Sequence, residues 1–353
     1  MKRHRNGFWS WQWKSHQICR RQNMKKNKSI LKTITTSREI SLLVVLVLLC
    51  AAITIKSPSF MTYKSIIDML RNNTVTMIMA VGMLGILLVG GIDISVASSL
   101  ALSGMTAGML MKYGVVKNVF LLFLIAMAIG GLCGLINGLV ISRGKVLPII
   151  ATMGAMYVYR GLAYLVANNE WVSAEDLGTF SSFALDKFWG INYVIWVLIG
   201  VYALFFVMMK WTRLGRKVYA VGSNKEAASI SGINISNVEL FVYVIMGILA
   251  GICGTIAVSV YSSAQPNMLY GKEMDIIAAC VIGGVSMSGG RGSVAGALLG
   301  GLVLAVIAKA LPLVGIEAIA QNTVKGVIIL VVIILNVITQ RTIDRNNLKE
   351  REI

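Results

Sequence analysis

Long apolar stretches separated by short polar breaks dominate this chain. Residues 271–300, GKEMDIIAACVIGGVSMSGGRGSVAGALLG, show the pattern: an acidic pair enters an apolar run, which breaks at a glycine-rich turn and resumes. A helix of about 20 apolar residues crosses roughly 30 Å of hydrocarbon. Hydropathy, interrupted at glycine, proline and charge, predicts ten spans, namely 41–55, 68–90, 94–112, 117–142, 146–167, 191–210, 237–260, 274–288, 293–311 and 322–340. The sequence therefore predicts an all-α polytopic membrane protein of about ten transmembrane helices.

Composition agrees with this fold class, and the charge pattern indicates an orientation. The chain is 56% hydrophobic and 14% charged, whereas soluble proteins carry about 25% charged residues. Its net charge of +18 could indicate nucleic-acid binding. However, placing both termini in the cytoplasm puts most of the 33 lysines and arginines there too, as the positive-inside rule requires. The excess charge is then topological, so we expect membrane lipid and no nucleic acid as a partner.

The same pattern divides the chain into a membrane domain and two tails. We expect a basic cytoplasmic tail over 1–40, a transmembrane domain over 41–340 with a cytoplasmic segment at 211–236, and a C-terminal tail over 341–353. A second methionine, Met24, opens a stretch typical of a natural start, so we expect residues 1–23 to be an upstream extension or disordered. Both histidines lie in the N-terminal tail and the five cysteines are scattered, so no metal site or cofactor is predicted.

Three charges fall inside or near apolar spans, where each costs about 2.5–3.5 kcal/mol on insertion scales. Lys325 lies near an outer end and can extend its amine to the surface. Arg160 can do the same, or it can bridge helices or face a pore. Asp93 follows a glycine pair, so its carboxylate can cap the next helix or can contact a solute at a gate. These alternatives stay open at the level of sequence.

Small residues recur at helical spacing in several spans. The glycines repeat every fourth residue in three stretches, which are Gly130, Gly134 and Gly138; Gly247 and Gly251; and Gly292, Gly296 and Gly300. This spacing lets helix backbones approach closely. It predicts a compact bundle and is common to membrane proteins of every function.

The polar segment KWTRLGRKVYAVGSNKEAASISGINISNVEL leaves the membrane between two spans. Its core, NKEAASISG, predicts a short amphipathic helix closed by Gly232. A short helix projecting into the cytosol suits a lever that another protein grips, although an ordinary interfacial loop would read similarly.

Here the chain resembles a known family. Glu226-Ala227-Ala228 with Gly232 is similar to the EAA-xxx-G coupling pattern of permeases in ATP-binding-cassette importers, and RLGRKVYAVGSNKEAASISGI is similar to the corresponding loop of ribose-type monosaccharide permeases. GGIDISVASS, ATMGAMYVYRGLAYL and EMDIIAACVIGGVSMSGGRGS resemble further segments of that family, so the likeness extends over most of residues 40–340. One departure is Ala97, where the family usually has glycine.

The resemblance implies a larger machine in the bacterial plasma (inner) membrane. It implies a second permease copy, identical or different, a separate ATPase subunit and an extracytoplasmic solute-binding protein. The residues it assigns to ATPase contact are Arg216, Asn224, Glu226, Ala227, Ala228 and Gly232. The chain has no G-x-x-x-x-G-K-[ST] phosphate loop, so the resemblance implies a transport subunit and not an enzyme.

Under this interpretation the remaining polar residues receive provisional roles. The acidic segment 168–190, which could also be a plain solvated loop, and the start of the eighth span are expected to dock the binding protein through Glu170, Glu175, Asp176, Lys272, Glu273 and Asp275. Asp93, Asn137 and Gln265 are candidates to line the translocation path or a gate.

The expected solute is ribose or a similar sugar, and the alternatives are an autoinducer-2-like furanosyl signal or rhamnose. An ion-coupled secondary transporter is a different class, which would need a network of carboxylates in the membrane. An intramembrane enzyme would need catalytic motifs that the body of the chain lacks.

Overall fold

The protein is almost entirely helical. The computed structural model describes residues 38–317, 319–327, 329–331 and 334. The predicted N-terminal tail up to residue 37, with its second start at Met24, and the predicted C-terminal tail lie outside the described residues.

The described helices follow the predicted apolar stretches closely. In chain order they are α2 (Arg38–Lys56), α3 (Tyr63–Leu88), α4 (Val96–Lys112), α5 (Val119–Ser142), α6 (Pro148–Ala167), α7 (Ala174–Leu177), α8 (Tyr193–Trp211), α9 (Arg213–Ser223), α10 (Lys225–Ile230), α11 (Ile235–Tyr261), α12 (Lys272–Ile282) and α13 (Val294–Leu313). Two 3₁₀ turns, η1 (Pro58–Met61) and η2 (Gly178–Ser182), and one antiparallel strand pair, β1 (Lys187–Phe188) with β2 (Ile191–Asn192), complete them. A further apolar helix, Ile319–Val331, follows α13 and is called the C-terminal helix below.

Seven of the described helices are long and apolar enough to cross a membrane, namely α2, α3, α5, α6, α8, α11 and α13. The other three predicted spans correspond to shorter helices among the described residues: α4 has 17 residues, α12 has 11, and the third is the C-terminal helix. The predicted span 274–288 ends early, at Ile282, because Gly283 and Gly284 follow and Gly284 has a φ of +82°. The expectation of about ten spans is thus confirmed only as a polytopic helical fold with seven long helices.

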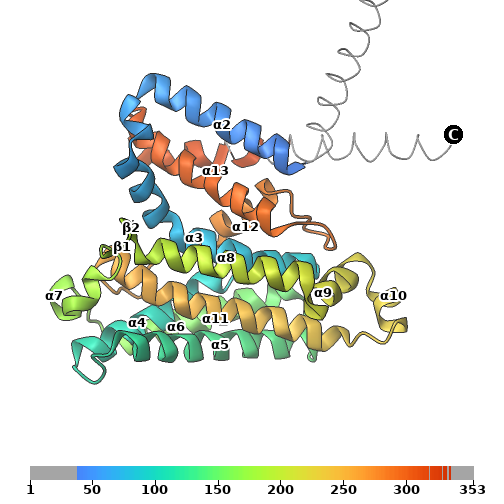
Figure 1. Cartoon of the computed structure of the whole chain (residues 1–353). Coiled ribbons are helices and arrows are strands. Elements are labelled where there is room, and N and C mark those ends of the chain that lie inside the picture. Colours follow the sequence, from blue (N-terminus) through green and yellow to red (C-terminus); the bar gives the residue numbers. More distant parts are fainter. Residues whose placement is uncertain (1–37, 318, 328, 332–333, 335–353) are drawn as a thin grey trace, which may run out of the picture.

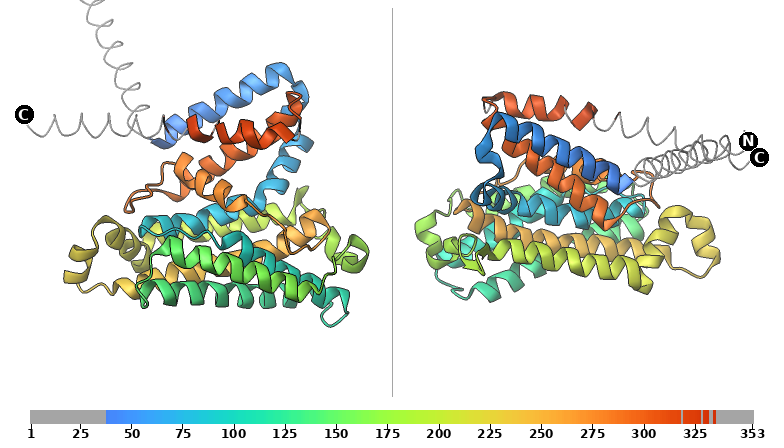
Figure 2. Two further views of the ribbon diagram at one scale, coloured as in Figure 1. Left: turned by 180° about the vertical axis from the view of Figure 1, so that it is seen from behind. Right: turned by 45° about the horizontal axis from the view of Figure 1, so that its top comes forward.

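Helix α3 is the centre of the molecule. It contacts α11 and α8 on one side and α12 and α13 on the other, and the segment from Met77 to Leu88 is almost completely buried. Helices α4, α5, α6, α8 and α11 form the larger group with α3, while α2, α12 and α13 stand as a second group beside it (Figures 1 and 2). Because this segment of α3 has neighbouring helices on all sides, it is apolar all round.

The two polar segments lie at opposite ends of the bundle. Helices α9 and α10 project beyond one end, and α7 with the β1–β2 pair lies at the other (Figure 1). This is the relative arrangement that the predicted topology requires for segments 211–236 and 168–190.

Two of the predicted glycine stripes face each other. In the contact between α5 and α11, a Cβ on Gly134 would overlap the carbonyl oxygen of Tyr243, and one on Gly130 would overlap that of Gly247. Helices α12 and α13 meet in the same way, with Gly283 and Gly300 against the partner backbone. Close backbone packing of this kind replaces the hydrophobic driving force that helices lack within lipid.

Substituting Gly134 with alanine is therefore expected to lower the unfolding temperature of the purified protein in detergent by several degrees. The added methyl group has no space between α5 and α11, and such overpacking costs about 1–3 kcal/mol. Gly161→Ala in α6 is the matched control, because nothing lies within 4 Å of a Cβ built there. Alanine favours a helix by about 1 kcal/mol over glycine. Equal unfolding temperatures for the two variants would contradict the packing assigned to Gly134.

Candidate functional site

The segment 211–236, which was predicted to be cytoplasmic, folds as two short helices rather than one. The Thr212 side chain accepts a hydrogen bond from the Gly215 N–H at 3.2 Å and so caps α9. The Asn224 side chain accepts from the Ala227 N–H at 2.9 Å and caps α10. Helix α10 was predicted from the sequence and α9 was not, although the threonine before RLGRKVYAVGS is an ordinary N-cap signal.

Gly232 closes α10 as predicted. Its φ is +78°, its own N–H donates to Ser229, and the next N–H, of Ile233, donates back to Ala228. This is the paired C-terminal hydrogen-bond pattern that needs a left-handed residue after the helix. The prediction of a short helix closed by this glycine is confirmed.

The six residues assigned by resemblance to ATPase contact all lie on this segment. Four of them are exposed, namely Arg216, Asn224, Glu226 and Ala227, whereas Ala228 is on the buried face of α10. The tip of α10 also presents Ile230 with 88% of its surface exposed. Lys225 forms an ion pair with Glu239 of α11 at 2.7 Å, which ties α10 to the long helix that follows it.

Helix α9 touches the membrane bundle through its backbone at Gly222 and through the side chain of Tyr219. Gly222 lies so close to the Leu88 carbonyl, at the end of α3, that a Cβ there would overlap it. The Leu88 carbonyl accepts a hydrogen bond from the Gly290 N–H at 2.9 Å, and the Tyr219 hydroxyl donates to the Gly292 carbonyl at 2.8 Å. The glycine-rich turn between α12 and α13 is thus in direct contact with both α9 and the end of α3.

A buried polar network begins a few residues after Leu88. The Asp93 carboxylate accepts hydrogen bonds from the Ser95 N–H at 2.8 Å and the Ser95 hydroxyl at 2.7 Å. The Asn137 amide of α5 donates to that hydroxyl at 2.8 Å, and the Tyr159 hydroxyl of α6 donates to the Asn137 amide oxygen at 3.0 Å. Asp93 is only 3% exposed and Asn137 2%.

Side chains of two other helices also bind the backbone of segment 89–95. The Tyr243 hydroxyl of α11 donates to the Ile92 carbonyl at 3.1 Å, and the Ile94 N–H donates to the Thr152 hydroxyl of α6 at 3.2 Å. Asp93 therefore binds one backbone N–H, that of Ser95 directly before α4, and holds the turn into this helix rather than its first turn.

The three predicted path residues do not form one cluster. Asp93 and Asn137 share the buried network, whereas Gln265 lies in segment 262–271 near the opposite end. There Ala264 pairs with Val172 in an isolated antiparallel bridge. The roles proposed for these three residues remain predictions.

The predicted docking residues of segment 168–190 lie at the end of the bundle opposite α10. Glu170 forms an ion pair with Lys112 at 2.7 Å, and Glu175 is exposed. Asp176 accepts hydrogen bonds from the Ser173 N–H at 2.9 Å and hydroxyl at 3.1 Å, and the backbone hydrogen bond above all lowers the pKa of this carboxyl from its usual value.

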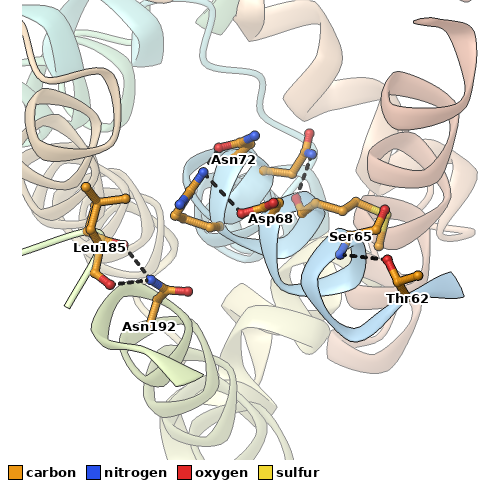
Figure 3. Close-up of polar contacts among 10 residues, drawn as sticks. Thr62, Ser65, Asp68, Asn72, Leu185 and Asn192 are labelled. Carbon is orange, nitrogen blue, oxygen red and sulfur yellow. Dashed lines mark hydrogen bonds and ion pairs between the residues drawn. The ribbon is translucent and has the colours of Figure 1, made fainter. Parts of the chain in front are cut away.

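Polar contacts also anchor the chain around this segment. Figure 3 shows the Asn192 amide, which donates to the carbonyls of Ala184 and Leu185 at 2.9 Å each, near the start of α3, where Thr62 accepts from the Ser65 N–H. Segment 168–190 is therefore held in a defined conformation at the end of the bundle.

The other predicted docking residues, at the start of α12, are partly inside the fold. Lys272 donates to Asp275 at 3.1 Å, and Lys325 of the C-terminal helix forms an ion pair with the same carboxylate oxygen. Glu273 is only 8% exposed. The interpretation of Lys325 as a side chain that merely extends to the surface is wrong, because its amine is held by Asp275.

Arg160 bridges helix α6 to the non-helical segment 262–271, which resembles the helix-bridging alternative but with a loop as the partner. Its guanidinium donates from α6 to the carbonyls of Pro266 at 2.7 Å and Met268 at 3.0 Å, and it lies over the Tyr270 ring. It thereby fixes the non-helical segment before α12.

The chain is similar in sequence to known transport permeases. Residues 65–336 match the family described as "Branched-chain amino acid transport system / permease component". The chain is 36% identical over 297 residues to the ribose import permease protein RbsC of Escherichia coli (strain K12), which covers 83% of this chain and 92% of that protein. It is 37% identical over 295 residues to RbsC of Bacillus subtilis (strain 168), covering 82% and 90%.

Permeases named for other sugars are also similar. The galactose/methyl galactoside import permease protein MglC of Escherichia coli (strain K12) is 32% identical over 321 residues, which is 86% of this chain and 95% of that protein. No solved structure matches the chain.

Replacing Asn137 with alanine is expected to lower the unfolding temperature, because the Ser95 and Tyr159 hydroxyls would each lose one of their two buried hydrogen bonds. Each such hydrogen bond contributes about 0.5–1.5 kcal/mol. Asn72→Ala, at an exposed position of α3, is the control and should unfold like the unmodified protein. Thermal unfolding in detergent measures both, and an Asn137 variant as stable as the control would show that the network does not hold segment 89–95.

Proposed function

Because the chain belongs to the family of branched-chain amino acid transport system permease components, we propose that it is the membrane permease subunit of an ATP-binding-cassette importer for a monosaccharide. The observation that carries this function is the alignment over more than four-fifths of the chain with import permeases for ribose. A permease named for L-arabinose and one named for galactose and methyl galactoside align over similar lengths. The solute class is therefore a monosaccharide, with ribose as the leading choice.

The proposed topology has ten membrane segments and both termini in the cytoplasm. The seven long helices supply seven crossings, and α4, α12 and the C-terminal helix supply the other three as shorter helices. The opposite placement of α10 and α7 supports this arrangement, because one end must meet an ATPase and the other a binding protein. The basic residues of the α9–α10 segment favour the cytoplasm for that end.

In the proposed mechanism the ATPase grips α10 and moves the bundle through α9. The contacts of Gly222 with Leu88 and of Tyr219 with the turn at Gly292 would pass that movement to α3, α12 and α13. Two permease copies, identical or different, would enclose the path between them. A solute-binding protein would deliver the sugar at the end that carries α7. The described residues of the membrane bundle hold few charges, which fits a path in which the binding protein selects the solute.

Reconstitution of the permease with its ATPase and binding protein in proteoliposomes tests the function. We expect ATP-dependent uptake of a labelled monosaccharide, and failure with ribose, arabinose and galactose alike would reject the proposed solute class. In the same system, Glu226→Lys should reduce uptake at least tenfold while each purified subunit still folds, because a reversed charge at an exposed contact opposes docking of the ATPase. Glu317→Lys, an exposed position beyond α13, is the matched control. Unchanged uptake in the Glu226 variant would contradict the coupling role.

Charge reversal at the other end should act differently. Glu175→Lys is expected to raise the concentration of binding protein needed for half-maximal stimulation of ATP hydrolysis, with the unstimulated hydrolysis rate unchanged. Exposed charges at an interface mainly steer association, so the shift should shrink as salt is added. A titration of binding protein against ATPase activity measures it. If the titration matched that of the unmodified complex at low salt, α7 would not belong to the docking surface.

A further inference from the structure

A cavity of about 600 Å³ runs along the free side of α12, facing the C-terminal helix. Side chains of both helices and of the turns at either end of α12 line it. Its apolar wall includes Ile277, Val281 and Ile329. Polar groups from Tyr270, Lys272, Asp275, Asn322 and Lys325 line it as well. Cavities of roughly 300–1,000 Å³ with an apolar wall and a few convergent polar groups are typical of small-molecule sites.

The charged groups of this cavity are arranged around one carboxylate. The Oδ2 atom of Asp275 accepts from Lys272 and also binds the Lys325 amine, and the Asp275 and Lys325 side chains are each only 14% exposed. Among the described residues no further hydrogen bond reaches Asp275, so its Oδ1 atom can accept another donor. Each lysine ammonium group carries three N–H donors and uses one of them to bind this carboxylate, so each has donors left for a ligand.

This combination matches a neutral polyhydroxylated ligand. A sugar hydroxyl both donates and accepts, so neighbouring hydroxyls can donate to Asp275 and accept from a lysine at the same time. Asn322, which is exposed to the cavity side, offers both an amide donor and an acceptor. The Tyr270 ring, 73% exposed, provides an apolar face for the C–H side of a sugar ring. An anionic ligand would instead meet the carboxylate in the middle of the two amines.

The position of the cavity along the chain suits transport. Segment 262–271, which precedes α12, pairs with Val172 at the end that carries α7. The turn that follows α12 contacts Leu88 and Gly222 at the end that carries α9. The cavity therefore lies on the helix that connects the expected docking end with the expected coupling end. Arg160 fixes segment 262–271 through the carbonyls of Pro266 and Met268 and so sets the position of Tyr270.

We propose that the cavity between α12 and the C-terminal helix is a saccharide-binding subsite of the permease, with Asp275 and Asn322 as its hydroxyl-binding residues. The inference rests on the proposed monosaccharide transport and adds to it a site within this chain. A sugar released by the binding protein would bind there in passing, held by a few hydrogen bonds that are weak enough to release it.

Two variants and one control test the subsite. Asn322→Ala removes an exposed amide and is expected to leave the fold intact, and Asp275→Asn removes the charge while keeping the shape. Gln321→Ala is the matched control, because Gln321 is the neighbour on the same helix but does not line the cavity. The permease–ATPase complex in nanodiscs, without binding protein, is probed by saturation-transfer NMR with D-ribose, L-arabinose and D-galactose in turn.

We expect a saturation-transfer signal on the sugar protons for the unmodified complex and for Gln321→Ala. For Asn322→Ala and Asp275→Asn we expect that signal to be about tenfold weaker. In proteoliposomes with binding protein, the same two variants should lose uptake. For Asn322→Ala, which lies outside the expected docking surface, binding-protein-stimulated ATP hydrolysis and the unfolding temperature should stay unchanged. Sugar signals and uptake that are equal in all four proteins would overturn the subsite and leave the proposed function standing. If the unmodified complex with binding protein carries none of the three sugars, the proposed solute class itself fails, whatever the variants do.

Discussion

A backbone that leaves a helix between long membrane helices has little or no water to bond, so its N–H and C=O groups need partners within the protein. Two segments of this chain face that constraint, 89–95 before α4 and 262–271 before α12. The first is held by Asn137, Thr152 and Tyr243 from three different helices, and the second by Arg160. Polar side chains from other helices thus bind both segments, where the backbone leaves a helix.

The first break, together with the turn after α12, explains how the parts of the proposed importer would be connected. The first break begins directly after Leu88, the residue that α9 touches through Gly222. The turn after α12 bonds to the same carbonyl through Gly290. A displacement of α9 would therefore reach the segment before α4 and the turn after α12 through the backbone contact at Gly222 and the hydrogen bond of Tyr219. Glycine is required at Gly222 because a side chain there would separate the surfaces that must move together.

The two aspartates Asp93 and Asp275 have different surroundings and different roles. Asp93 is enclosed by hydroxyl and amide groups that hold a loop, which is a structural use of a carboxylate. Asp275 is shared by two lysines beside a cavity of about 600 Å³, so its second oxygen is available to a ligand. In the sequence both residues stand at the edge of an apolar run, Asp93 alone and Asp275 two positions after Glu273. Their surroundings separate a fold-holding role from a ligand-binding one.

The apolar pattern determined the helical membrane fold and the positions of the long helices, and the polar segment around Ala227 determined a short helix with its closing glycine. Those features depend on local chemistry, since a bilayer demands long apolar helices and Gly232 permits a conformation that other residues resist. The glycine stripes also predicted close packing, but not that Gly134 would meet Tyr243. The separation of Gln265 from Asp93 and Asn137, the pairing of Lys325 with Asp275 across 50 positions and the bridge made by Arg160 were decided by the tertiary structure. Each joins residues far apart in the chain, and no local pattern encodes which distant helix will supply the partner.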